Sequence, residues 1–280
     1  MRIINSNIIT DAVRDMCIEA NCHINRDIKD ALLSARETEK SDISRGVIEN
    51  LIKNADIADK KEVPICQDTG MAVFFIEIGS DVHVEGDTLT DAVNKGVRKG
   101  YTEGYLRKSV VRDPLDRVNT GDNTPAVIYY DFVKGDKIKI TIAPKGFGSE
   151  NKSAVKMLNP SDGLQGVKDF VIETVRKAGA NPCPPMVVGV GIGGTMDKAA
   201  QLSKKALTRD ITVRNENQFY AELENDLLET VNKLGIGPQG MGGTTTALAV
   251  NTEVFPTHIA GLPVAVNISC HATRHVTKIL

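Results

Sequence analysis

Three of the five cysteines stand in short segments rich in proline, glycine or histidine, and their thiols are the first candidates for chemistry in this chain. Cys66 lies in Pro64-Ile65-Cys66-Gln67-Asp68-Thr69-Gly70, Cys183 in Asn181-Pro182-Cys183-Pro184-Pro185, and Cys270 in Ser269-Cys270-His271. Proline fixes φ and removes a backbone donor, which is incompatible with a helix interior. We therefore expect these thiols on loops or at element ends, where ligands and nucleophiles are usually held.

The number of such cysteines bears on the kind of site they could form. An electron-transfer iron–sulfur cluster or a structural zinc ion is usually held by four protein ligands, whereas a catalytic metal keeps one position open. Three loop thiolates would leave that position for substrate. No C-x-x-C motif links the three cysteines, so three unrelated loop thiols are an equally good interpretation of their spacing alone.

One glycine-rich segment suggests a different enzyme class. The segment Gly189 to Gly194 fits G-x-G-x-x-G after an apolar stretch, which is a signal for dinucleotide binding. The acidic residue expected at the end of a second strand about twenty residues later is missing, because Asp210 precedes an apolar segment instead. The alternative is a glycine-rich turn that lets the backbone approach a metal centre.

A second glycine-rich segment, Lys145 to Ser153, is close to a phosphate-binding loop. It departs from that motif because Asn151 takes the place of the glycine before Lys152. The amides of Gly146 and Gly148 could still bind a carboxylate, and a tight turn is the simpler interpretation.

Five motifs, in order along nearly the whole chain, resemble the alpha subunit of class I fumarate hydratase and of the related L-tartrate dehydratase. They are Cys66 to Gly70, Lys145 to Ser153, Asn181 to Pro185, Gly189 to Thr195 and His258 to Pro263. The resemblance implies a hydro-lyase that reversibly hydrates fumarate to L-malate, with L-tartrate or mesaconate as alternative substrates. It also implies that Cys66, Cys183 and Cys270 bind a [4Fe–4S] cluster whose fourth iron takes the substrate.

The same resemblance assigns roles to further residues. Asp68 is expected to handle a proton, and His258 to exchange a proton or contact substrate, since an imidazole can exchange a proton at neutral pH. Substrate binding is expected of Gln67, Arg107 and Gly148. A guanidinium suits a carboxylate because it donates two parallel hydrogen bonds. The simpler interpretations are an Asp-Thr-Gly turn at Asp68 and a solvated arginine at Arg107.

The resemblance also implies a partner. Single-chain members of the family continue past the third cysteine into a second domain that supplies substrate contacts and a catalytic threonine, whereas two-subunit members carry these groups on a beta subunit. We therefore expect a beta subunit, and either an alpha2-beta2 assembly or a homo-oligomer. A non-catalytic iron–sulfur module and an NAD-binding subunit remain as alternatives from other classes.

Composition limits the kind of protein this is. Hydrophobic residues make up 41% and charged residues 25% of the 280 residues, and the net charge is −2. These values are typical of a globular protein and argue against a nucleic-acid surface. The first residues lack an apolar run suited to a signal peptide or membrane helix, so a cytoplasmic protein is expected.

The two remaining cysteines look different from the other three. Cys17 shares a helical face with Val13, Met16 and Ala20, which favours a buried packing residue. Cys22 precedes His23, and a Cys-His metal pair there is conceivable but has no further ligands.

The sequence predicts an α+β fold: a helical N-terminal region, then mixed and antiparallel sheets flanked by helices. We expect one domain over residues 1–280, either as one body or as two intimate subdomains. The expected helices follow Thr10, Asn25 and Ser44 as caps and cover Asp87 to Tyr101, Asp162 to Ala178, Met196 to Thr208 and Asn217 to Leu234. The expected strands are Met71 to Ile78, Met186 to Val190, Thr245 to Thr252, Pro263 to Ile268, and a hairpin of Ala126 to Val133 with Lys137 to Ile142 around Gly135-Asp136.

Overall fold

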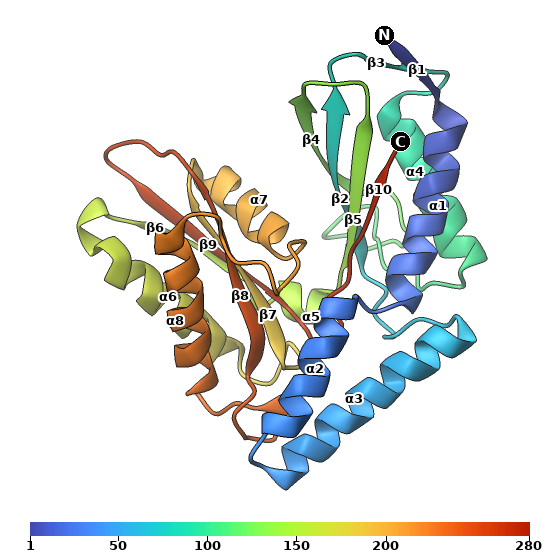
Figure 1. Ribbon diagram of the computed structural model, residues 1–280. Helices are drawn as coiled ribbons and strands as arrows, with labels where there is room; N and C mark the ends of the chain where they lie inside the picture. Colours follow the sequence, from blue (N-terminus) through green and yellow to red (C-terminus); the bar gives the residue numbers. More distant parts are fainter. The chain divides into compact units, whose positions relative to one another are not determined.

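The computed structural model describes residues 1–280, and the chain forms two compact units (Figure 1). Unit 1 comprises residues 1–24, 55–147 and 274–280, and unit 2 comprises residues 25–54 and 148–273. Helix α3 (Asp42–Lys61) and the short helix α5 (Phe147–Glu150) each contain a boundary between units. The α+β class predicted from the sequence is confirmed.

Unit 1 is a four-stranded sheet, in the order β10-β5-β2-β4, with two helices packed on it. Its elements are β1 (Arg2–Asn5), α1 (Ser6–Cys22), β2 (Met71–Gly79), β3 (Val82–Glu85), α4 (Leu89–Glu103), β4 (Val127–Val133), β5 (Ile138–Lys145) and β10 (Val276–Ile279). Helices α1 and α4 come very close, because a Cβ at Gly96 would lie 2.6 Å from the carbonyl oxygen of Thr10. Fully buried Phe74, Ile140 and Tyr101 belong to the core between these helices and the sheet.

The predicted hairpin of β4 with β5 is wrong. Strand β2 lies between them and pairs in parallel with β4 and antiparallel with β5. The turn after β4 instead crosses the end of β2, where Gly79 N donates to Lys137 O at 2.9 Å. Gly79 is required there, since a Cβ would lie 2.3 Å from Gly135 O. Alternation within a strand predicts its buried face and not its partner, and the apolar β2 takes the central position.

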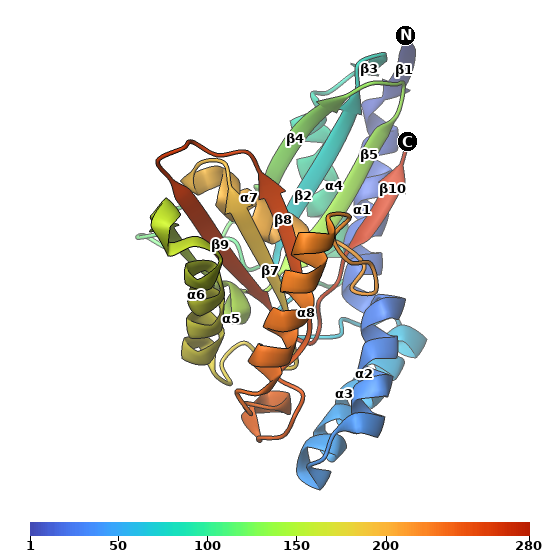
Figure 2. The ribbon, with the colours of Figure 1, turned by 60° about the vertical axis from the view of Figure 1, so that its left-hand side comes forward.

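Unit 2 is a second four-stranded sheet, in the order β6-β9-β7-β8, with helices on both faces (Figure 2). Its elements are α2 (Arg26–Thr38), β6 (Ala154–Leu158), the 3-10 turn η1 (Pro160–Asp162), α6 (Gly163–Ala178), β7 (Met186–Gly193), α7 (Met196–Ala206), α8 (Gln218–Asn232), the 3-10 turn η2 (Pro238–Gly240), β8 (Ala247–Phe255) and β9 (Leu262–Ser269). Helices α6 and α8 share a core with Val188 and Val190 of β7.

The glycines of β7 explain the dinucleotide-like motif. Gly189 and Gly191 lie inside the strand and face α7, where a Cβ would come within 2.0 Å of the carbonyl oxygens of Ser203 and Ala199. These glycines let α7 pack directly on the sheet. They form neither a phosphate-binding turn nor the turn toward a metal centre that the sequence suggested as the alternative.

Two helix starts differ from the sequence prediction for the same reason. Thr10 and Ser44 were expected to cap helices, but α1 begins at Ser6 and α3 at Asp42. Their hydroxyls bond distant carbonyl oxygens instead: Thr10 donates to Ala92 O at 3.1 Å and Ser44 to Gly242 O at 2.6 Å. The predicted cap at Asn25 is confirmed in position, and the helix expected from Asn217 begins one residue later, at Gln218. None of the helices has the length and apolar character needed to cross a membrane.

Glu39, directly after α2, organises the loop before β8. The backbone N–H groups of Ser41, Thr244 and Thr245 all donate to its carboxylate, at 2.9 to 3.1 Å. Burial alone would raise the pKa of Glu39, but these donors outweigh it and lower the pKa below its usual value. The charged form of Glu39 therefore stabilises unit 2.

We predict that Glu39→Gln lowers the free energy of unfolding at pH 7 by about 1–3 kcal/mol, because an amide cannot satisfy all of these donors. A group whose folded-state pKa is lowered stabilises above its ordinary pKa, and that contribution is lost as the pH falls through the folded-state value. Denaturant unfolding across the acid range should show the gap to wild type closing at low pH. Glu37→Gln on the exposed face of α2 is the matched control, with a change within about 0.5 kcal/mol. An equal loss in both variants would contradict the assignment.

Candidate metal centre and substrate site

The Cys66 loop precedes β2 in unit 1, and one of its backbone N–H groups bonds the sulfur of Cys66. Cys66 is half-buried, and its Sγ accepts a hydrogen bond from Asp68 N at 3.4 Å. Gly70 closes the loop with a φ of 75°, and a Cβ there would lie 2.8 Å from the backbone of Lys145. The loop therefore directs one of its own backbone N–H groups at the sulfur, the atom of Cys66 that would bind a metal.

The half-buried Asp68 connects this loop to the segment after β5. Its Oδ1 accepts from Gly70 N at 3.0 Å and its Oδ2 from Phe147 N at 2.8 Å. The glycine-rich segment after β5 was expected to present amides to a carboxylate. In the structure the amide of Phe147 binds a carboxylate of the protein itself, and the next residue, Gly148, is exposed at the start of unit 2.

Arg107 is held beside the same loop. The Thr69 hydroxyl donates to Arg107 O at 2.9 Å, and the side chains of Arg107 and Gln67 are exposed. Unit 1 thus brings together Cys66, Gln67, Asp68 and Arg107.

Two buried residues that the sequence analysis did not single out hold this loop in place. The hydroxyl of Tyr101 donates to Thr69 O at 2.8 Å, and Asn123 Nδ2 donates to Gly70 O at 3.2 Å. Asn123 is fully buried with a φ of 61°. The only sequence signal for it is the Gly-Asp-Asn-Thr-Pro turn in which it stands.

Unit 2 brings the other two cysteines to one end of its sheet. Cys183 is exposed on the loop before β7, and Cys270 is half-buried directly after β9. These strands are antiparallel, with Val187 opposite Ser269, so the start of β7 neighbours the end of β9. His271 N donates to Cys183 O at 3.3 Å, which joins the two loops directly. The predicted loop positions of all three cysteines are confirmed.

His258 lies at the opposite end of that sheet. It stands in the loop between β8 and β9, which Figure 2 shows at the far end of the strands from the start of β7. The residue is exposed, and its Nδ1 accepts from Ala260 N at 3.2 Å. The eight residues of β9 separate His258 from Cys270, a span of about 25 Å. Unit 2 therefore does not bring His258 to its two cysteines.

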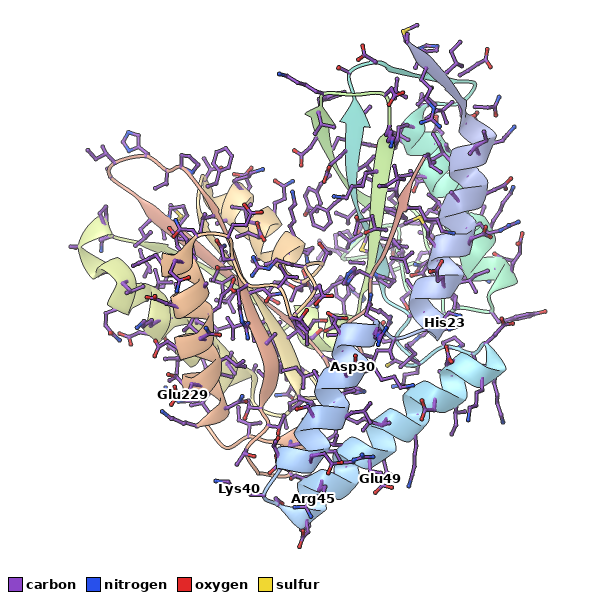
Figure 3. All side chains as sticks on the ribbon, viewed as in Figure 1. His23, Asp30, Lys40, Arg45, Glu49 and Glu229 are labelled. Carbon is purple, nitrogen blue, oxygen red and sulfur yellow. The ribbon has the colours of Figure 1, made fainter.

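The other cysteines are packing residues, as predicted for Cys17. Cys17 and Cys22 are buried in α1, and burial raises the pKa of both thiols. His23 at the end of α1 (Figure 3) points its Nδ1 to Asp59 Oδ1 at 2.6 Å, an ion pair when the ring is protonated. Neither unit by itself gathers three His, Cys, Asp or Glu side chains into a metal site. This agrees with the division of the candidate ligands, one in unit 1 and two in unit 2.

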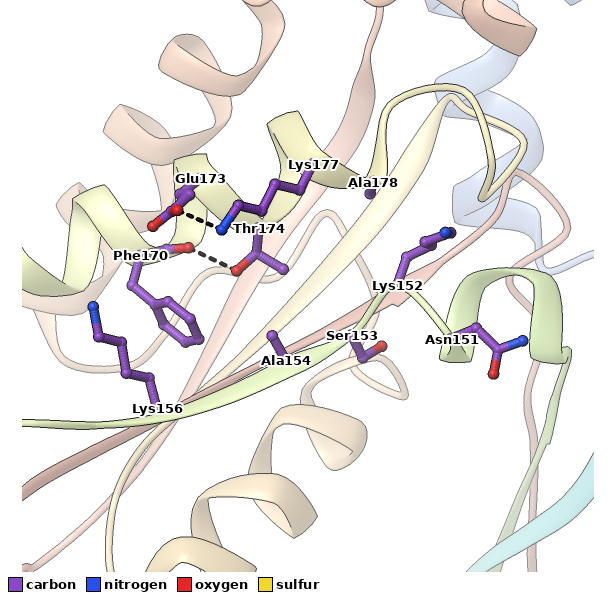
Figure 4. Close-up of a pocket in the computed structure, with 10 residues that line it drawn as sticks. All are labelled: Asn151, Lys152, Ser153, Ala154, Lys156, Phe170, Glu173, Thr174, Lys177 and Ala178. Carbon is purple, nitrogen blue, oxygen red and sulfur yellow. Dashed lines mark hydrogen bonds and ion pairs between the residues drawn. The ribbon is translucent and has the colours of Figure 1, made fainter. Parts of the chain in front are cut away.

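A hollow of about 500 Å³ lies beside β6 and α6 in unit 2 (Figure 4). Three lysines line it, Lys152, Lys156 and Lys177, of which Lys177 pairs with Glu173 at 2.6 Å. The lining contains no cysteine, histidine or other predicted site residue. The hollow is therefore separate from the candidate residues described above.

Comparison with known proteins gives matches along nearly the whole chain. The profile of the family described as Fumarate hydratase (Fumerase) matches residues 10–278. The Putative L(+)-tartrate dehydratase subunit alpha of Methanocaldococcus jannaschii is 45% identical and covers 96% of this chain and 96% of that relative. The L(+)-tartrate dehydratase subunit alpha of Escherichia coli K12 is 34% identical over 98% of this chain and 91% of that relative.

The exposures of the five thiols predict their order of alkylation in metal-free protein. Cys183 should react first, and Cys17 at least about a hundredfold more slowly, because reaction needs an accessible thiolate. Timed labelling with iodoacetamide, followed by peptide mass analysis, measures each rate, and labelling in denaturant is the control that should equalise them. Labelling of Cys17 as fast as Cys183 in the folded chain would contradict the described burial.

Proposed function

The chain belongs to the fumarate hydratase (Fumerase) family, and on this premise we propose that it is the alpha subunit of an L(+)-tartrate dehydratase. Such a hydro-lyase removes water from L-tartrate to give oxaloacetate. The observation that carries the proposal is the near full-length likeness to relatives named as tartrate dehydratase alpha subunits. The sequence puts fumarate first and L-tartrate as an alternative, and these relatives favour the alternative.

The proposal assigns Cys66, Cys183 and Cys270 as ligands of a [4Fe–4S] cluster. The donor set fits such a group, since Cys66 Sγ accepts a backbone hydrogen bond and the loops of Cys183 and Cys270 are bonded to each other. When bound with three protein ligands, the cluster supplies an open iron as a Lewis acid for a substrate hydroxyl and carboxylate. Cys66 belongs to unit 1, and Cys183 and Cys270 belong to unit 2.

Residues of the Cys66 loop are proposed to bind the substrate and move its proton. Asp68 is a candidate base, because each of its oxygens accepts one backbone hydrogen bond and keeps a further lone pair. The exposed guanidinium of Arg107 can take a substrate carboxylate through two parallel hydrogen bonds. Gln67 and the amide of Gly148, both exposed, are proposed to contact the remaining oxygens of the substrate.

A beta subunit is proposed to complete the site. The relatives are named as alpha subunits, and the family resemblance places further substrate contacts and a catalytic threonine on a second chain or domain. The isolated alpha chain is therefore expected to bind the cluster and to turn over little substrate.

His258 is retained in this proposal as a substrate contact of a second copy. Because β9 keeps it about 25 Å from Cys270 of its own chain, it cannot reach a small dicarboxylate bound there. In a symmetric assembly with two alpha chains, His258 of each copy could contact the substrate bound at the site of the other copy.

The test of the proposed function is the substrate preference of the reconstituted alpha-beta enzyme. We expect the kcat/KM for L-tartrate to be at least about tenfold higher than that for L-malate. A site that hydrogen-bonds the second hydroxyl of tartrate has no partner for that bond when malate is bound. A preference for L-malate and fumarate would contradict the tartrate assignment and make the enzyme a fumarate hydratase. Reversible one-electron cycling without hydro-lyase activity would favour the redox module, and NAD binding without iron would favour the nucleotide subunit.

Asp68→Asn should lower turnover per cluster by about a hundredfold, the usual contribution of a positioned acid–base group, while iron content is kept. Asn also sets an NH2 group against a backbone donor, so a matched control is needed for the cost to the loop. Asp113→Asn is that control, because Asp113 likewise accepts two backbone hydrogen bonds, from Leu115 N and Asp116 N at 2.8 Å, in an exposed loop of the same unit. Wild-type turnover of Asp68→Asn would make Asp68 a turn residue only.

The assignment of His258 to a second copy predicts complementation. Cys183→Ser chains lack the cluster, and His258→Asn chains lack the imidazole, so each homo-oligomer should be nearly inactive. Random co-assembly of equal amounts should restore about a quarter of the wild-type sites, because half of the pairs are mixed and each mixed pair has one intact site. A mixture no more active than the sum of its parts would show that His258 does not act across copies.

A further inference from the structure

The five residues from Cys270 to Arg274 contact both of the other cysteine loops. His271 bonds the Cys183 loop within unit 2, and Arg274 bonds the Cys66 loop within unit 1. The chain passes from unit 2 to unit 1 between Thr273 and Arg274. One short segment thus supplies a candidate ligand itself and holds the loops of the other two.

The hydrogen bonds of His271 fix the Cys183 loop by its backbone. Both His271 N, at 3.3 Å, and His271 Nδ1, at 3.0 Å, approach the carbonyl oxygen of Cys183. A carbonyl oxygen only accepts, so Nδ1 donates to it in the tautomer that carries the proton on Nδ1; in the other tautomer Nδ1 accepts from Gln239 Nε2, which lies 3.2 Å away. The bond from His271 N is present in both tautomers. Gln239 holds the next carbonyl, because its N and its Nε2 each donate to Pro184 O at 2.8 Å. Cys183 has a φ of 54°, a conformation that a non-glycine residue keeps only when its surroundings hold it.

Arg274 fixes the Cys66 loop in the corresponding way. Its side chain is buried, with 5% exposure, and its Nη2 donates to Asp68 O at 2.7 Å. Between the two contacts the segment turns on itself, since Thr273 N and Thr273 Oγ1 donate to Cys270 O at 3.0 and 2.7 Å. The turn fixes the spacing of Cys270 from Arg274 along the chain.

We propose that His271 and Arg274 are positioning residues for the three cysteine ligands, acting through carbonyl oxygens of the ligand loops and not through the metal. This inference rests on the proposed cluster. It explains why a polar ring and a buried guanidinium lie among the candidate ligands without being ligands themselves.

The test compares two amide replacements of His271. Asn places its NH2 near the position of Nδ1, whereas Gln places it near Nε2. After anaerobic reconstitution of the full-length chain, His271→Ala and His271→Gln should release iron to a chelator at least about tenfold faster than wild type. His271→Asn should restore the slow release. His83→Ala, at an exposed position on β3, is the control and should match wild type.

A second readout needs no cluster. In metal-free chains, hydrogen exchange of peptides covering residues 180–186 and 237–243 should be faster in His271→Ala and close to wild type in His271→Asn. Two variants of Arg274 are compared in the same way. Arg274→Met should speed the hydrogen exchange of residues 66–70, whereas Arg274→Lys should leave it close to wild type. Equal exchange in all variants would overturn the positioning role, whereas absence of a cluster in wild type would overturn the proposed function and leave this exchange result standing.

Discussion

The antiparallel pairing of β7 with β9 is the interaction on which the candidate centre of unit 2 depends. It places the start of one strand beside the end of the other, so that Cys183 and Cys270 share one end of the sheet although 87 positions separate them in the sequence. The same pairing sends His258 to the opposite end. Gly189 and Gly191 serve this arrangement, because they let α7 pack against the strand that carries the Cys183 loop.

In unit 1 the Cys66 loop is held in place by buried hydrogen bonds and not by strand pairing. The Cys66 loop lies between a helix end and β2, and its carbonyl oxygens at residues 68 to 70 accept from Arg274, Tyr101 and Asn123. These donors are all buried, where an unsatisfied carbonyl would be costly. The loop is therefore held by groups that are not themselves exposed to substrate, while Gln67 and Arg107 remain exposed.

The sequence predicted what local chemistry determines. The prolines and the glycine around Cys66 and Cys183 exclude helix interiors, and the loop positions of all three cysteines were predicted correctly. Strand pairing depends on residues far apart in the chain, so the partner of β4 was predicted wrongly and the distance from His258 to Cys270 could not be foreseen. His271, Gln239 and Arg274 gain their roles from carbonyl oxygens of distant loops, which no local motif reports.

The most direct test of the ligand assignment is the iron and sulfide content of the anaerobically reconstituted chain and of five variants, each with one cysteine replaced by serine. About four irons and four sulfides are expected for wild type, Cys17→Ser and Cys22→Ser, and loss of most of this content is expected in Cys66→Ser, Cys183→Ser and Cys270→Ser. Full iron content in any of the last three, or its loss in Cys17→Ser with an intact fold, would contradict the assigned ligand set.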